Sequence, residues 1–274
     1  MSLLFHATNF VKVNRHGDTV TAECTLLSNA VEAVAWVDAS VQTLQISRAG
    51  WANYRSSAGE TGVFDLPALI GVEAYITGGP VLRKVLGGPG LELPYDLISE
   101  CFRGVLQAET YFFLERGFVS AKQYDDFCEQ HSIGACRFYS HLEETELQWT
   151  EWLGSTERDY NLFNRCKTVS ITQQAVNRLV SASFMDSFHH LGVSLEIDPQ
   201  GVVLSAQGNF INAPDPICFQ NDAHLFKLPG LNLREMNKKE IAALTGGPEG
   251  CNHLVDLLYE IKKALQANEV RPQS

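Results

Sequence analysis

The 274-residue sequence has no apolar run that approaches the roughly 20 residues a membrane-spanning helix requires. Its first ten residues contain no basic region followed by a long apolar segment, so we expect no signal peptide. Lysine and arginine do not cluster, and the formal net charge is −11, which argues against binding to nucleic acid or to an anionic membrane surface. The glycine patterns of Rossmann folds and phosphate-binding loops are also absent. We therefore expect a cytoplasmic protein whose partner is a small-molecule ligand.

The cysteines also indicate a reducing compartment. There are seven of them, an odd number at irregular spacings, so we interpret them as reduced thiols rather than a disulfide framework. Hydrophobic residues make up 45% of the chain, which is enough for one large domain or two small ones.

A glycine-rich turn followed by a one-sided apolar helix carries the strongest chemical signal. Gly246-Gly-Pro-Glu-Gly250 precedes Cys251 and His253. A thiol at a helix N-terminus lies among unpaired backbone N–H groups and near the positive end of the helix dipole, which favour the thiolate. A thiolate with an imidazole two residues away suits metal ligation or nucleophilic attack. The following helix is predicted from apolar residues at helical spacing, namely Leu254, Leu257, Leu258, Ile261 and Leu265.

The order of predicted elements occurs twice along the chain. Gly71 and Gly230 are 159 residues apart, as are Gly87 and Gly246, and Asp38 and Asp198 are 160 apart. We therefore predict an internal duplication, with a first repeat at 1–108, a predominantly helical connector at 109–165 and a second repeat at 166–274. Strands are expected at 19–24, 30–37 and 41–47 and again at 179–186, 189–197 and 202–212. Helices are expected at 66–76, 80–87 and 95–108 and again at 235–245 and 252–267.

The two predicted repeats differ in their polar residues. Where the second has Cys251 and His253, the same spacing gives Leu91 and Leu93 in the first. His189 and His190 likewise correspond to Asn29 and Ala30. We therefore expect the second repeat to carry a functional site and the first to be structural.

The second repeat resembles an uncharacterised bacterial family of unknown function over about 100 residues. The resemblance rests on four segments and implies no known activity. They are Asp186-Ser-Phe-His-His190, Pro216-Ile-Cys218, Leu228-Pro-Gly230 and the Gly-Gly-x-x-Gly-Cys-x-His-Leu motif at 246–254.

A more remote resemblance is to the NifU/IscU-type iron–sulfur scaffold fold. It is carried by a strand–turn–strand at Val193–Val203, by Cys218 after it, and by Cys251 and His253 at the last helix. It implies an α+β protein of two tandem repeats, each a small antiparallel sheet followed by helices, joined by the helical connector. Near the first ligand position of that fold this chain has Asp186, His189 and His190 but no thiol. The resemblance therefore implies a single metal ion rather than an iron–sulfur cluster.

The leading hypothesis is one Zn²⁺ or Fe²⁺ ion held by Cys218, Cys251, His253 and His189, with His190 or Asp186 as alternatives to His189. His189 or Asp186 would otherwise serve as a general base. The expected function is a metal-dependent hydrolase or lyase acting on a small organic acid or aromatic metabolite. The alternatives are a non-catalytic carrier of metal or sulfur, a metal-free enzyme with Cys251 as nucleophile, and two buried cysteines without a function.

Overall fold

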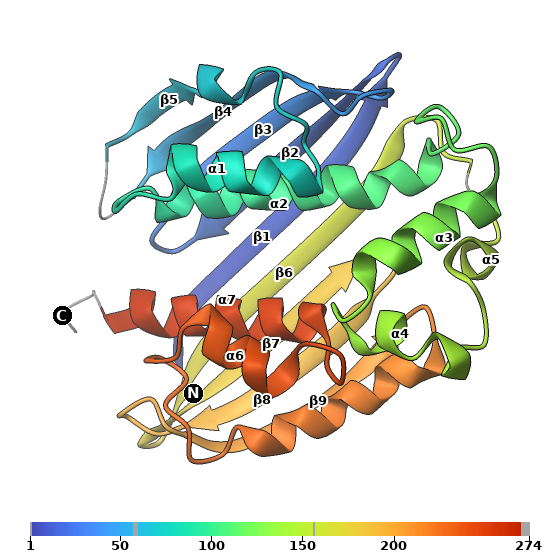
Figure 1. Ribbon diagram of the computed structural model, residues 1–274. Helices are drawn as coiled ribbons and strands as arrows, with labels where there is room; N and C mark the ends of the chain where they lie inside the picture. Colours follow the sequence, from blue (N-terminus) through green and yellow to red (C-terminus); the bar gives the residue numbers. More distant parts are fainter. Residues whose placement is uncertain (1, 57–59, 156, 270–274) are drawn as a thin grey trace. The chain divides into compact units, whose positions relative to one another are not determined.

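The computed structural model describes residues 2–56, 60–155 and 157–269. Its strands alternate between buried and partly exposed positions, as in Thr19-Val-Thr-Ala22, where the valine and the alanine are buried. The nine strands of these described residues form one antiparallel sheet in the order β5-β4-β3-β2-β1-β6-β7-β8-β9 (Figure 1). They are β1 (Ser2–His16), β2 (Thr19–Ser28), β3 (Glu32–Ser40), β4 (Ile46–Arg55), β5 (Gly62–Asp65), β6 (Asn161–Gln174), β7 (Asn177–Asp186), β8 (His190–Ile197) and β9 (Val203–Asn212).

The predicted fold class, two small sheets in an iron–sulfur-scaffold arrangement, is therefore wrong. The two longest strands account for the error. β1 has 15 residues and β6 has 14, and they are neighbours in the sheet, so the strands of both predicted repeats belong to one sheet. The sequence pattern gave β1 no strand assignment and placed the start of β6 in the helical connector.

Most other predicted elements are present with shifted ends, but the segment predicted as a helix at 66–76 is mainly turns around the short 3-10 helix Pro67–Leu69. β2, β3, β7, β8 and β9 overlap their predicted segments. The predicted strand at 41–47 is mostly a turn, with Leu44 at a φ of 54°, and β4 begins only at Ile46. The helical elements are η1 (Pro67–Leu69), η2 (Ile76–Gly78), α1 (Gly79–Leu86), α2 (Glu92–Ala108), η3 (Glu109–Tyr111), α3 (Ala121–Ser132), α4 (Arg137–Ser140), η4 (Leu142–Glu144), α5 (Trp149–Leu153), η5 (Pro216–Lys227), α6 (Lys238–Thr245) and α7 (Asn252–Glu269).

The chain divides into two compact units. The N-terminal unit comprises residues 8–124 and 153–166, and the C-terminal unit comprises residues 1–7, 125–152 and 167–274. Helices of the length and apolar character needed to cross a membrane do not occur in the described ranges.

In the N-terminal unit, α2 packs across β2 and β3 (Figure 1). Leu97, Ile98 and Val105 are buried on its inner side. Gly104 allows the close approach of this helix, because a Cβ there would lie 2.9 Å from the Val13 side chain and 3.0 Å from that of Val11.

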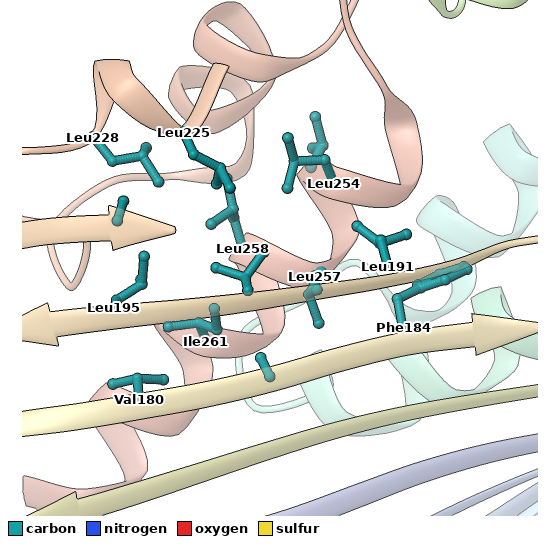
Figure 2. Close-up of a cluster of buried hydrophobic side chains, with 14 of the residues drawn as sticks. Val180, Phe184, Leu191, Leu195, Leu225, Leu228, Leu254, Leu257, Leu258 and Ile261 are labelled. Atoms are coloured by element: carbon teal, nitrogen blue, oxygen red, sulfur yellow. The ribbon is translucent and has the colours of Figure 1, made fainter. Parts of the chain in front are cut away.

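In the C-terminal unit, α7 packs against β7 as the apolar spacing predicts. Figure 2 shows the resulting core between this helix and the strands. Asn237 and Glu240 form a capping box at the start of α6, which fixes the helix that precedes the glycine-rich turn. The core includes Val180, Phe184, Leu191, Leu195, Leu254, Leu257, Leu258 and Ile261.

In each unit, a glutamate of the long helix pairs with a buried cation of β6. In the N-terminal unit, Glu100 of α2 pairs with Arg103 at 2.7 Å and with Arg165 of β6 at 3.5 Å. In the C-terminal unit, Glu260 of α7 pairs with Lys263 at 3.0 Å and with Lys167 of β6 at 2.7 Å. The two glutamates are 160 residues apart, and so are Arg103 and Lys263.

Candidate metal centre

The turn between β7 and β8 is built on the Asp186 side chain. Its Oδ1 accepts the backbone N–H of Phe188 at 2.9 Å and that of His189 at 2.8 Å, and the Asp186 N–H donates to the His189 carbonyl at 2.8 Å. This is the local hydrogen bonding that aspartate offers in tight turns. The Asp186 side chain is 0% exposed, so its position is fixed by the surrounding protein.

The same carboxylate orients the His189 ring. Asp186 Oδ1 lies 3.2 Å from His189 Nδ1, and the His189 side chain is 12% exposed. A histidine whose Nδ1 contacts a carboxylate presents its Nε2 as the second coordinating or proton-accepting atom. Asp186 therefore sets both the position and the orientation of this imidazole.

His253 enters the site from the first turn of α7. The backbone N–H of Cys251 donates to the Thr245 carbonyl at 2.8 Å and closes the glycine-rich turn before the helix. A Cβ at Gly250 would collide with the Thr245 carbonyl oxygen, so only glycine fits there. The His253 ring centroid then lies 3.9 Å from that of His189.

Asp186, His189 and His253 together form a ligand group. One ligand atom from each lies within 4.8 Å of the others, although the residues come from a strand end, a turn and a helix. Two imidazoles and one carboxylate are a known set for Zn²⁺ and Fe²⁺. Within the described ranges, one other group meets the same criterion, namely His141, Glu143 and Glu144. Both glutamates of that group are exposed, and His141 Nε2 is already 2.8 Å from Glu249.

Cys251 lies beside this group. Its Sγ is 3.9 Å from His253 Nδ1, and the residue is buried. Burial raises the pKa of the Cys251 thiol from 9.0 to about 12, although the backbone N–H groups of Leu254 and His253 act in the opposite direction. The rise in the thiol pKa caused by desolvation is thus larger than the decrease caused by the helix N-terminus. The thiol is therefore protonated near neutral pH unless a cation binds it.

Cys218 is buried in the first turn of η5 and is not a member of the Asp186, His189 and His253 group. Burial, followed by the effects of Cys251 and Cys136, raises the pKa of its thiol to about 12. The four predicted ligands are therefore divided. His189 and His253 come together with Asp186, and Cys251 lies beside His253. Cys218 lies outside this group.

The choice between His189 and His190 was open in the sequence. Of these two described residues, only His189 is in the ligand group. His190 begins β8 and pairs with Met185 and Asn212 in the sheet. Consecutive residues at a strand end point in different directions, so only one of the two can reach His253.

Aromatic side chains surround the two imidazoles. The Phe184 ring lies 4.8 Å from that of His253, and Phe188 lies 6.5 Å from His189. Trp149 contacts Phe188 edge-on at 4.7 Å and stacks with Trp152 at 5.6 Å. Phe188 and Trp149 are buried, so these rings support the site.

The first half of the chain contains the same turn without the ligands. Ser28 Oγ accepts the N–H of Ala30 at 3.1 Å and that of Val31 at 2.8 Å, and the Ser28 N–H donates to the Val31 carbonyl at 2.8 Å. Asp186 therefore corresponds to Ser28, and His189 to Val31, with a spacing of 158 residues. The spacing of 160 used in the sequence analysis pairs His189 with Asn29, which is two residues away.

Comparison with known proteins gives a family match for the part of the chain that contains the candidate site. No curated protein and no solved structure matches the chain. Residues 168–266, which contain Asp186, His189, Cys218, Cys251 and His253, match the model of a family described as a protein of unknown function (DUF2889). The chain is thus similar, over the second predicted repeat, to a family without a known activity, as the sequence led us to expect.

Proposed function

We propose that the protein binds a single Zn²⁺ or Fe²⁺ ion through Asp186, His189 and His253. The observation that carries the proposal is the convergence of their ligand atoms within 4.8 Å. This set replaces Cys218 with Asp186 among the ligands first predicted. Cys251 Sγ lies 3.9 Å from His253 Nδ1. In this proposal Cys251 is either the fourth ligand of the ion or a neighbour of an open coordination position.

Each residue has a distinct role in this proposal. Asp186 holds the turn and orients the His189 ring through one oxygen, and its carboxylate is the anionic ligand of the proposed ion. His253 is held by the first turn of α7 and by its contacts with His189 and Phe184. An ion at this position would act as a Lewis acid or lower the pKa of a bound water.

The enclosure of the site favours a retained ion over a transferred one. The Asp186 side chain is fully buried and Cys251 is 6% exposed, whereas a metal or sulfur carrier must present its cargo to a partner. A metal-free Cys251 nucleophile is disfavoured because burial raises the pKa of its thiol to about 12. We therefore propose a metal-dependent hydrolase or lyase for a small organic acid or aromatic metabolite.

The two halves of the chain support an ancestral duplication, which we also propose. α1 begins at Gly79 and α6 at Lys238, 159 residues later, and both are eight residues long. The Ser28 and Asp186 turns and the Glu100 and Glu260 ion pairs add matching local features. In this account only the second copy retains ligands, because Val31 and Leu93 occupy the positions of His189 and His253.

Elemental analysis of the untagged protein tests the metal proposal. We expect about one equivalent of zinc or iron in the wild type, and its loss in His189→Ala and His253→Ala. His190→Ala is the matched control and should keep the ion, because it removes the adjacent imidazole without touching the ligand group. Unchanged metal content in both ligand variants, with native circular dichroism, would overturn the proposal.

A further inference from the structure

The glycine-rich turn before Cys251 carries one charged side chain, Glu249, which other segments of the C-terminal unit hold in place. Arg137 Nη1 donates to Glu249 Oε2 at 3.1 Å, and His141 Nε2 lies 2.8 Å from Glu249 Oε1. The Nε2 group of His224 donates to the Glu249 backbone carbonyl. Glu249 is therefore connected through its carboxylate to α4 and the residue after it, and through its carbonyl to η5.

Further hydrogen bonds extend these connections to the rest of the turn. The Arg137 N–H donates to the Gly250 carbonyl at 2.8 Å. Lys227 Nζ donates to His224 Nδ1 at 2.8 Å and to the Leu244 carbonyl at 3.2 Å. Because an ammonium group can only donate, His224 Nδ1 is the acceptor and its Nε2 carries the proton given to Glu249. We refer to Arg137, His141, His224, Lys227 and Glu249 together as the Glu249 cluster.

The Glu249 cluster fixes the backbone directly before the helix that carries His253. The Gly250 N–H donates to the Gly247 carbonyl at 2.9 Å, and the Cys251 N–H donates to the Thr245 carbonyl at 2.8 Å. α7 begins at the next residue, so His253 lies in its first turn. A change in the path of this turn therefore moves His253 relative to the ligands on the β7–β8 turn.

The two halves of the chain differ at this position. The first predicted repeat has Gly87-Gly-Pro-Gly90 where the second has Gly246-Gly-Pro-Glu249, so a spacing of 159 residues places glycine opposite Glu249. That repeat also has Leu93 in place of His253. The anchored glutamate thus occurs in the half of the chain that has the proposed ligands.

The exposure of Glu249 indicates a local effect of its contacts. Its side chain is 63% exposed, and exposed ion pairs add little to the stability of a whole fold. The five groups that meet here nevertheless come from two helical segments and one turn. Their contacts are therefore expected to fix the turn rather than to stabilise the whole C-terminal unit.

We propose that Glu249 is a positioning residue of the candidate metal centre, which holds His253 where it meets His189 and Asp186. Its effect on the ion rests on the proposed function, and the proposal extends that function to a residue outside the ligand group. Groups that hold a metal ligand in place raise the affinity of the site, because the ligand is already oriented before the ion binds.

Zinc affinity of Glu249 variants of the full-length protein tests the proposal. We expect the Kd for Zn²⁺ to rise at least about tenfold in Glu249→Ala, with an unfolding midpoint near that of the wild type. Glu249→Gln keeps an oxygen acceptor and should recover part of the affinity. Glu144→Ala is the matched control and should leave the Kd unchanged. It removes a carboxylate that lies 3.7 Å from the same His141 ring but does not belong to the turn.

Amide hydrogen exchange of the metal-free protein separates this proposal from the proposed function. We expect the Gly250 and Cys251 amides to exchange at least about tenfold faster in Glu249→Ala, and at the wild-type rate in Glu144→Ala. Unchanged exchange in a folded Glu249→Ala protein would overturn the proposal, whether or not the wild type binds zinc. Faster exchange with an unchanged Kd would also overturn it, because the turn would then be structural only. Faster exchange in a protein whose wild type binds no zinc would overturn the metal centre but support the role of Glu249 in holding the turn.

Discussion

At the scale of single residues, Asp186 combines a structural and a chemical role in one side chain. Its Oδ1 accepts two backbone N–H groups of the β7–β8 turn and also contacts His189 Nδ1. The sequence indicated this residue as a ligand or base but gave no sign of its role in the turn. The equivalent Ser28 performs the turn function alone.

Two substitutions of Asp186 should therefore separate the two roles. Asp186→Asn keeps an oxygen acceptor for the turn but removes the anionic ligand, so we expect near-native stability and a metal affinity lower by at least about 10–100-fold, the loss that follows removal of a residue that only orients a ligand. Asp186→Ala removes the acceptor as well and should also cost about 1–3 kcal/mol in the free energy of unfolding. Chemical denaturation and metal titration measure the two effects. Equal stability of the two variants would contradict the turn role, and Ser28→Ala is the matched control for stability without metal loss.

Burial of thiols also predicts a pH dependence of stability. Cys101 of α2 is fully buried, and desolvation raises the pKa of its thiol well above 9.0. The folded protein keeps this thiol protonated while the unfolded chain ionises it. The stabilising contribution is thus complete below pH 9 and decreases as the pH rises toward the folded-state value, by up to about 1.4 kcal/mol per pH unit.

Comparison of the wild type with Cys101→Ala isolates this contribution from other groups that titrate in alkali. The variant should be less stable at pH 7, because it loses a buried sulfur, and the difference should become smaller between pH 9 and pH 11. Urea unfolding at several pH values measures it. A difference that stays constant over this range would contradict the account.

At the scale of elements, β1 and β6 show why the sheet could not be predicted. Their buried positions include polar residues, namely Asn9 and Asn14 in β1 and Arg165 and Lys167 in β6. These residues interrupt the hydrophobic alternation that identifies strands, and their partners lie far away in the sequence. The helices with complete apolar spacing, α2 and α7, were predicted correctly, because helix periodicity is a local property.

The buried ion pairs between these helices and β6 give a prediction for each unit. Glu260→Gln removes the charge of the carboxylate that pairs with Lys167, whose side chain is 2% exposed, and Glu100→Gln does the same for the pair with Arg165. We expect each to cost about 3 kcal/mol in the free energy of unfolding. Lys263→Met, which removes only the more exposed partner of Glu260, should cost less than about 1 kcal/mol. Similar values for Glu260→Gln and Lys263→Met would contradict the importance of the β6 contact.

At the scale of the whole molecule, the proposed duplication relates two halves of the chain that differ in their polar residues. Glycine spacing in the sequence indicated the repeat order and the glycine-rich turn before α7. Two proposed ligands, Asp186 and His189, lie at the end of β7 and in the turn after it. There the spacing between the two halves is 158 residues rather than 160, and this difference of two residues changes which side chains correspond. The sequence therefore led to the proposal of a site in the second half, but it could not show which of the candidate residues lie close together.

A graft into the first half tests this correspondence. The triple variant Ser28→Asp, Val31→His and Leu93→His places the three proposed ligands on the equivalent turn and helix start. We expect one additional equivalent of bound zinc, with weaker affinity than the natural site because the surrounding aromatic rings differ. Val31→His alone is the control and should add none. A folded triple variant that binds no additional metal would contradict the proposed equivalence.

The most direct test of the central claim is anomalous diffraction at the zinc edge from crystals of the zinc-loaded protein. The account predicts one anomalous peak bounded by Asp186, His189 and His253, with metal–nitrogen distances of about 2.0–2.1 Å. A peak elsewhere, or a loaded crystal with no peak between these three residues, would contradict it.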